Sequence, residues 1–121
     1  MVELVARSGE AAAYVPHRGD LISIAFDPTE GHEQAGSRPA LVLSHDEYNR
    51  VRWLAIVVPV TSRVRRGALE VPLPGSLKTQ GVVLVDQVRC VAWRERGAEF
   101  IERAPASLLN EVLGKLTTLL R

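Results

Sequence analysis

Short apolar runs separated by polar clusters dominate the pattern of this chain. Gly, Pro and Asp residues stand between several of the runs, as is typical of turns between strands. The runs with the length and β-branched content of strands are 21–26, 40–43, 53–60, 69–73, 82–85 and 88–93. The apolar stretch within 53–60 is continuous and predicts a strand buried on both faces. The pattern therefore predicts five or six short strands.

Two helices are predicted beside these strands. One short helical turn is expected at 45–49, capped by Ser44 with Glu47 three residues later. A longer helix begins at Pro105, because proline suits the first helical turn. Its apolar residues recur at helical spacing, and we expect all seven to be buried: 108, 109, 112, 113, 116, 119 and 120. The result is a mainly β fold of the α+β class, a small twisted barrel with the C-terminal helix packed on it.

The length and composition indicate one domain. With 121 residues, of which 46% are apolar, the chain is large enough to bury a single core. Residues 1–13 are Ala-rich with mixed charge and are predicted to be a lead-in segment, with the domain proper spanning 14–121. No apolar stretch approaches the roughly 20 residues that a membrane helix needs, and no secretion signal is recognisable.

The cysteine and histidine content indicates neither a disulfide nor a metal site. Cys90 is the single cysteine and is predicted to be a core side chain. The three histidines are too scattered for metal-ligand spacing, and no Gly-rich phosphate loop is present. We therefore expect a cytoplasmic protein without a metal or another cofactor.

Charge is balanced overall but uneven along the chain. Fifteen basic and 14 acidic residues give a formal net charge of +1, which alone does not indicate nucleic-acid binding. Five arginines nevertheless fall within seventeen residues: Arg50, Arg52, Arg63, Arg65 and Arg66. This segment is interpreted either as a cationic binding surface or as a loop whose arginines simply face water.

Polar groups at the ends of neighbouring strands suggest an active site. One polar cluster lies beside the apolar run 40–43 and the other follows the run 53–60, so these two runs would bring Glu33, Arg38 and Thr61 to one place. Without a metal, the chemistry open to such groups is acid-base catalysis with electrostatic stabilisation. RNA is suited to this chemistry, because its 2′-hydroxyl is an internal nucleophile and arginine binds phosphate through its planar guanidinium.

Each polar residue also has a structural interpretation. Glu33 and His32 are in a polar loop, and Thr61 after a buried strand is often bonded to a turn backbone. Asp86 is interpreted as a base or as a turn residue, and Gln87 as a contact to a base edge or as part of a hairpin.

Taken in order, the motifs resemble the MazF/PemK family of toxins. They are Gly19-Asp20, Asp27-Pro28, Gly31-His32-Glu33-Gln34-Ala35-Gly36, Arg38-Pro39-Ala40-Leu41-Val42-Leu43-Ser44, Tyr48-Asn49, Pro59-Val60-Thr61-Ser62 and Asp86-Gln87-Val88-Arg89. The resemblance extends through Trp93-Arg94-Glu95-Arg96-Gly97-Ala98 and Glu111-Val112-Leu113-Gly114-Lys115-Leu116, about nine tenths of the chain.

The resemblance implies an SH3-like barrel that forms a homodimer and cleaves single-stranded RNA without a metal. The products would carry a 2′,3′-cyclic phosphate and a 5′-hydroxyl. It also implies a cognate antitoxin of the MazE-like kind with an acidic C-terminal segment, and contact with DNA only through the antitoxin complex.

The resemblance also assigns roles to residues. In MazF-like members the arginine of Arg-Pro-Ala and the threonine of Pro-Val-Thr are central, here Arg38 and Thr61, and Glu33 matches a glutamate that assists activity. The expected RNA contacts are His32, Gln34, Arg65, Asp86 and Gln87.

One position separates two branches of the family. PemK/Kid-like members use an arginine and an aspartate two residues apart, with a loop histidine assisting, and this chain has Leu84 in place of that arginine. We therefore favour the MazF-like arrangement, in which Arg38 stabilises the phosphorane and donates a proton while Thr61 orients the phosphate. Glu33 is the candidate base and Asp86 the reserve.

Two other functions remain as alternatives. A CcdB-like protein of the same fold would poison DNA gyrase through its terminal helix, but this chain ends Thr117-Thr118-Leu119-Leu120-Arg121 without a tryptophan. The other alternative is a catalytically silent RNA-binding module.

Overall fold

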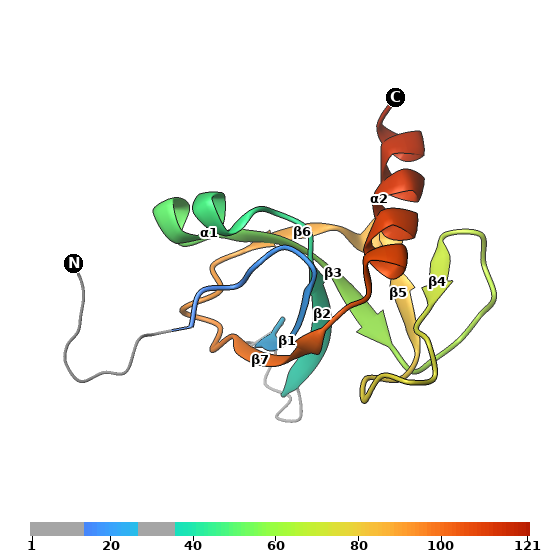
Figure 1. Ribbon diagram of the computed structural model, residues 1–121, viewed down its shortest axis with the longest axis horizontal. Helices are drawn as coiled ribbons and strands as arrows, with labels where there is room; N and C mark the ends of the chain where they lie inside the picture. The colour runs from blue at the N-terminus through green and yellow to red at the C-terminus, as the bar shows by residue number, and fades with distance from the viewer. Residues whose placement is uncertain (1–13, 27–35) are drawn as a thin grey trace.

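The computed structural model describes residues 14–26 and 36–121. Seven antiparallel strands form one strongly twisted sheet in the described part of the chain, and a long C-terminal helix lies against one end of it (Figure 1). The strands are β1 (Asp20–Ala25), β2 (Ser37–Val42), β3 (Ala55–Thr61), β4 (Glu70–Pro72), β5 (Val82–Leu84), β6 (Arg89–Val91) and β7 (Glu99–Arg103). The helical elements are α1 (Asp46–Arg52), the 3-10 turn η2 (Val85–Gln87) and α2 (Ala106–Leu120). The predicted α+β class is confirmed.

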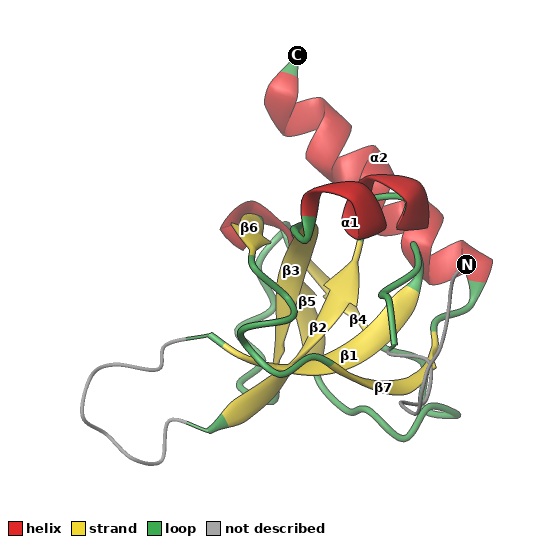
Figure 2. Cartoon of the chain, turned by 90° about the vertical axis from the view of Figure 1, so that its left-hand side faces the viewer, coloured by secondary structure: helices red, strands yellow, loops and turns green. Residues whose placement is uncertain are grey.

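Strand β3 is the centre of the sheet. The strand order is β4-β5-β3-β2-β1-β7, and β6 pairs with β3 beside β5. Thus β3 pairs with β2 through residues 57–59 on one edge, and with β6 and β5 on the other. Figure 2 shows the strands crossing beneath α1 and α2.

Alternate residues of the central strands enter two separate cores. Leu41, Val58 and Val60 pack with residues of α2 in one cluster. Ala40 and Val57 pack with Trp93 in the other. The period of two along a strand produces this division, and it confirms that β3 is buried on both faces.

The structure differs from the predicted strands in several places. Strand β2 begins at Ser37 rather than at Ala40, so Arg38 lies within it. Strand β7 was not predicted, because Phe100 and Ile101 are its only large apolar residues and the strand lies at an edge of the sheet. Strand β3 begins at Ala55 rather than at Trp53, which instead ends α1. Cys90 is exposed rather than in the core, because alternation turns Val91 inward and Cys90 outward.

The helices also differ from the sequence expectation. The core contacts of α2 end at Leu116: Leu108 and Val112 are buried, and Leu109, Leu113 and Leu116 are partly buried against the same cluster, whereas Leu119 is 46% exposed and Leu120 is 75% exposed. Figure 1 shows α2 continuing beyond the strands, which is why the prediction of seven buried residues was wrong.

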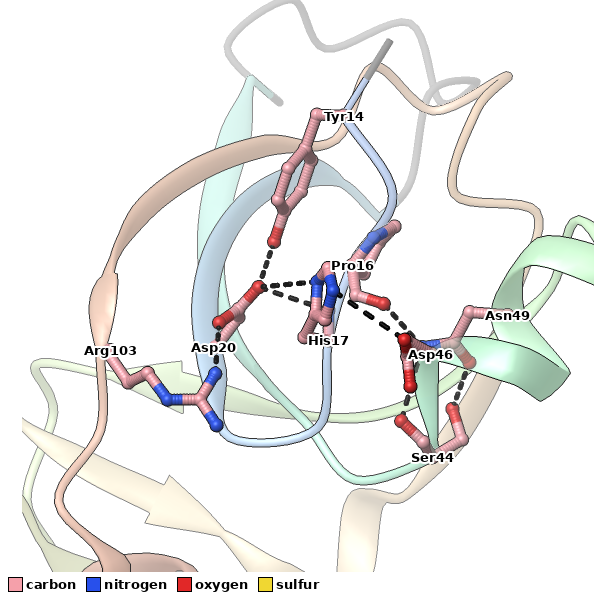
Figure 3. Close-up of polar contacts among 8 residues, drawn as sticks. All are labelled: Tyr14, Pro16, His17, Asp20, Ser44, Asp46, Asn49 and Arg103. Carbon is pink, nitrogen blue, oxygen red and sulfur yellow. Dashed lines mark hydrogen bonds and ion pairs between the residues drawn. The ribbon is translucent and has the colours of Figure 1, made fainter. Parts of the chain in front are cut away.

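Ser44 does not cap α1, because the N-cap residue is His45 and it makes no side-chain cap. The Ser44 hydroxyl instead donates to Asn49 Oδ1 at 2.5 Å and accepts the Ile56 N–H at 2.8 Å. The fully buried Asn49 side chain donates to the Pro16 carbonyl at 2.7 Å (Figure 3). These bonds join α1, β3 and the segment before β1.

Asp20 is a buried carboxylate that connects β1 with the segment before it and with β7. Its side chain accepts hydrogen bonds from the Tyr14 hydroxyl, from the His17 N–H at 3.0 Å and from Arg103 Nη1 at 2.9 Å (Figure 3). Burial and the bond to Asp20 raise the pKa of the Tyr14 phenol, so Tyr14 remains the proton donor. Only 3% of Asp20 is exposed, so its negative charge depends on these donors.

Asp20→Ala is expected to lower the free energy of unfolding by about 2–4 kcal/mol, because it leaves buried donors without an acceptor. Asp46→Ala is the matched control, since Asp46 is half-exposed and lies in the same region. Its expected effect is below about 0.5 kcal/mol. Urea unfolding measures both, and equal effects of the two variants would contradict the role of Asp20.

Candidate active site

A pocket of about 570 Å³ lies where β3, β5 and η2 end. It collects four of the predicted site residues, Thr61, Arg65, Asp86 and Gln87. The remaining lining residues are Arg63, Gly67, Ala68, Leu69, Glu70 and Leu84. The predicted residues His32, Glu33 and Gln34 lie outside the described residues. The pocket thus places arginines, a hydroxyl, an amide and carboxylates around one space.

Arg38 lies on β2, next to this pocket in the sheet order but not in its lining. Strands β2 and β3 pair through Leu41↔Val58 and Ala40↔Pro59. The same register continued by two residues puts Arg38 opposite Thr61, on the same face of the sheet. The ladder between β2 and β3 itself ends at Ala40↔Pro59, and the exposed Arg38 pairs with Ile24 of β1 on the other edge of β2.

The Thr61 hydroxyl takes part in a turn. Thr61 is the last residue of β3, pairs with Val82 of β5, and its Oγ1 accepts the N–H of Arg63 at 3.1 Å. This bond begins the arginine-containing loop at the strand end. The Thr61 side chain therefore does both things that the sequence suggested: it is bonded to the turn backbone, and it lines the pocket.

Glu70 holds the arginine loop from the opposite side. Its carboxylate accepts the N–H groups of Arg65 at 3.0 and 3.2 Å and of Arg66 at 2.8 Å. Arg66 has a positive φ of 61°, so the loop turns sharply at the place that Glu70 fixes. The sequence analysis did not predict a role for Glu70. An acidic residue four positions after Arg66 was nevertheless a usable signal for a contact with the arginine loop. The backbone of the loop is thereby positioned with its guanidinium groups left exposed.

Gly81 sets the position of Thr61 by close backbone contact. A Cβ at Gly81 would lie 2.2 Å from the Thr61 carbonyl oxygen, and Gly81 has a φ of +119°. Only glycine fits this approach. The preceding loop is anchored by Glu102 of β7, which accepts the N–H groups of Lys78 and Thr79 at 3.0 and 2.7 Å. Burial raises the pKa of the Glu102 carboxyl, but these bonds outweigh it and hold that pKa below its usual range.

Leu84, two residues before Asp86, lines the pocket. An apolar side chain there contributes surface for packing and no charge for a phosphate. Positive charge in the described part of the pocket comes instead from Arg63 and Arg65. The described residues contain no group of three His, Cys, Asp or Glu side chains arranged to hold a metal ion.

The sequence profile described as the PemK-like, MazF-like toxin of type II toxin-antitoxin system matches residues 17–120. The chain therefore belongs to this family of toxins. It is 44% identical over 107 residues to the endoribonuclease PemK of Escherichia coli, covering 85% of this chain and 80% of that protein. It is 51% identical over 85 residues to the endoribonuclease toxin MazF of Escherichia coli strain K12, covering 70% of this chain and 76% of that protein.

A solved structure gives the same result. The crystal structure of a MazE-MazF complex from Deinococcus radiodurans matches with a TM-score of 0.85 and 51% identity, over 89% of this chain and 97% of that chain. No helix in the described ranges is long and apolar enough to cross a membrane.

Gly81→Ala is expected to lower the free energy of unfolding by more than about 1 kcal/mol, because the new Cβ collides with the Thr61 carbonyl and the φ is unfavourable. Gly75→Ala in the same connection is the control, since a Cβ there meets nothing within 4 Å. Urea unfolding followed by circular dichroism compares them. A Gly81 variant as stable as the Gly75 variant would show that the contact does not position Thr61.

Proposed function

We propose that this chain is the toxin of a type II toxin–antitoxin pair and a sequence-specific endoribonuclease that cleaves single-stranded RNA, messenger RNA above all, and so inhibits translation and growth. The observation that carries the proposal is the pocket that joins Thr61 to Arg65, Asp86 and Gln87 within a fold of this family. The relatives named endoribonuclease support the reaction class.

The proposed reaction uses the 2′-hydroxyl of the substrate. Glu33 takes the 2′-hydroxyl proton, the 2′-oxygen bonds to phosphorus, and Arg38 stabilises the negative phosphorane. The bond from phosphorus to the 5′-oxygen then breaks, and that oxygen takes a proton from Arg38. The products are a 2′,3′-cyclic phosphate and a 5′-hydroxyl, with no metal or other cofactor in any step.

The pocket residues are proposed to bind the strand. Thr61 orients the scissile phosphate, while Arg65 supplies a cation for a neighbouring phosphate. Asp86 and Gln87 offer hydrogen-bonding groups to base edges, and His32 and Gln34 are proposed to do the same. A guanidinium loop whose backbone is fixed by Glu70 loses less conformational freedom when RNA binds.

The proposed assembly is a homodimer that a cognate antitoxin inhibits in the cytoplasm. An antitoxin with an acidic C-terminal segment has the charge to occupy an arginine-lined pocket in place of RNA. The solved MazE-MazF complex of Deinococcus radiodurans supports such a partner. Contact with DNA is proposed only through the antitoxin.

Arg38→Ala is expected to reduce cleavage of single-stranded RNA by about a hundredfold or more, because one well-placed donor stabilises the transition state by about 3–4 kcal/mol. The fold should survive, since Arg38 is exposed. Single-turnover cleavage of a long RNA measures the loss, and Arg121→Ala at the end of the chain is the control. Addition of a chelator is expected to leave the rate unchanged. Wild-type cleavage by the Arg38 variant, or abolition by the chelator, would refute the proposal.

The base is tested by two isosteric changes. Glu33→Gln is expected to lower kcat about a hundredfold with little change in KM, as the loss of a general base does. Asp86→Asn is expected to change mainly KM, because Asp86 is proposed to contact RNA. The reverse result would make Asp86 the base.

A further inference from the structure

A second pocket of about 270 Å³ lies at the other end of the molecule from the first. It is formed by the end of α1, by Tyr14 and Val15, and by the connection between β6 and β7. Its described lining residues are all different from those of the first pocket. Figure 1 shows α1 at the opposite end of the molecule from β4 and β5.

Parallel aromatic rings form the wall of this pocket. Trp53 stacks on Trp93 with ring centroids 5.8 Å apart and an angle of 15° between the planes. The Arg94 guanidinium lies over the Trp53 ring, 4.0 Å from its centroid. The Arg50 side chain also lines the pocket. Trp93 is only 5% exposed, so the accessible aromatic surface is the Trp53 ring, with Arg94 over it and Arg50 in the same lining.

The backbone at Trp53 is unusual for such a large residue. Trp53 ends α1 in the left-handed conformation, with a φ of 58°, where glycine is the unstrained choice. Its side chain is 47% exposed. Bulky residues in strained conformations cluster at functional sites. Both tryptophans of the chain are in this one pocket.

We propose that this pocket binds one nucleotide of single-stranded RNA that lies outside the cleaved bond. The base stacks on the exposed ring of Trp53 in place of the Arg94 guanidinium, while the buried Trp93 supports that ring from the core, and the flanking phosphates bind Arg50 and Arg94. This inference rests on the proposed endoribonuclease function, and it adds a substrate contact remote from the reacting phosphate. Aromatic stacking with guanidinium groups is the usual chemistry by which proteins hold single strands. An acidic peptide would use the two arginines but would gain little from parallel flat rings.

The binding test uses a non-cleavable 2′-O-methyl oligoribonucleotide and the intrinsic tryptophan fluorescence. In the wild-type protein, binding is expected to quench the emission, because the exposed Trp53 ring lines the pocket. Trp53→Gly is expected to raise the Kd about fivefold or more, the loss that removal of one stacked base causes. This variant also relaxes the strained φ, so its fold is retained, as circular dichroism can verify.

Arg94→Ala keeps the ring pair and removes one cation, so it provides a second test. Its Kd is also expected to rise about fivefold, whereas Arg52→Ala, which loses the same charge from α1 outside the pocket lining, changes the Kd by about twofold or less. Unchanged Kd values for both pocket variants would overturn the proposal. Quenching by a glutamate-rich peptide and not by the oligoribonucleotide would overturn it as well, and would assign the pocket to an acidic protein partner.

A cleavage assay on short and long substrates distinguishes a failure of this inference from a failure of the proposed endoribonuclease function. Trp53→Gly should cleave a short substrate, limited to the bond and its immediate neighbours, at the wild-type rate, and should show a raised KM only on a long substrate. An equal KM on the long substrate would overturn the inference while the endoribonuclease function stands. A wild-type protein that binds RNA in the pocket but cleaves none would refute the function and leave the binding site supported.

Discussion

The structure depends on the burial of β3 on both faces. Its residues alternate between two apolar cores, and its two edges pair with three other strands. A strand constrained on four sides has a fixed register, because a slip of one residue would exchange the contents of both cores. Thr61 is the last residue of this strand, so the fixed register of β3 also fixes the position of Thr61. The candidate active site is therefore built at the most constrained strand end of the fold.

The loops around the end of β3 are held by hydrogen bonds from their backbone N–H groups to carboxylates, and not by burial. Glu70 and Glu102 each accept N–H groups from a loop that would otherwise have to satisfy them with water. The reactive side chains remain exposed while the loops that carry them are anchored. Such an arrangement serves a protein that binds a long, flexible polymer, because the polymer needs open access and the site needs order.

The sequence predicted the parts of the fold that periodicity controls. The β-branched runs and the helical spacing after Pro105 identified most strands and α2, since burial imposes those periods. Strand β7 was missed because an edge strand with Phe100 and Ile101 carries too little apolar signal. The extent of α2 burial was overestimated because periodicity marks an apolar face but not where its partner surface ends.

The sequence predicted several of the residues that line the site, but not the residues that hold them in position. Motif order pointed to Thr61, Asp86 and Gln87, which one pocket brings together, whereas Glu70 and Gly81 act through backbone contacts that no motif marks. The roles of Arg38 and of the residues 32–34 stay predictions.

The placement of the aromatic rings has a consequence for any optical study of this protein. Trp53 and Trp93 stack at the α1 end, while β4, β5 and the Thr61 pocket lie at the other. Tryptophan emission therefore reports one end of the molecule only. An unfolding curve recorded by fluorescence would follow the melting of α1 and the connection between β6 and β7, and local opening around Thr61 would pass without a signal.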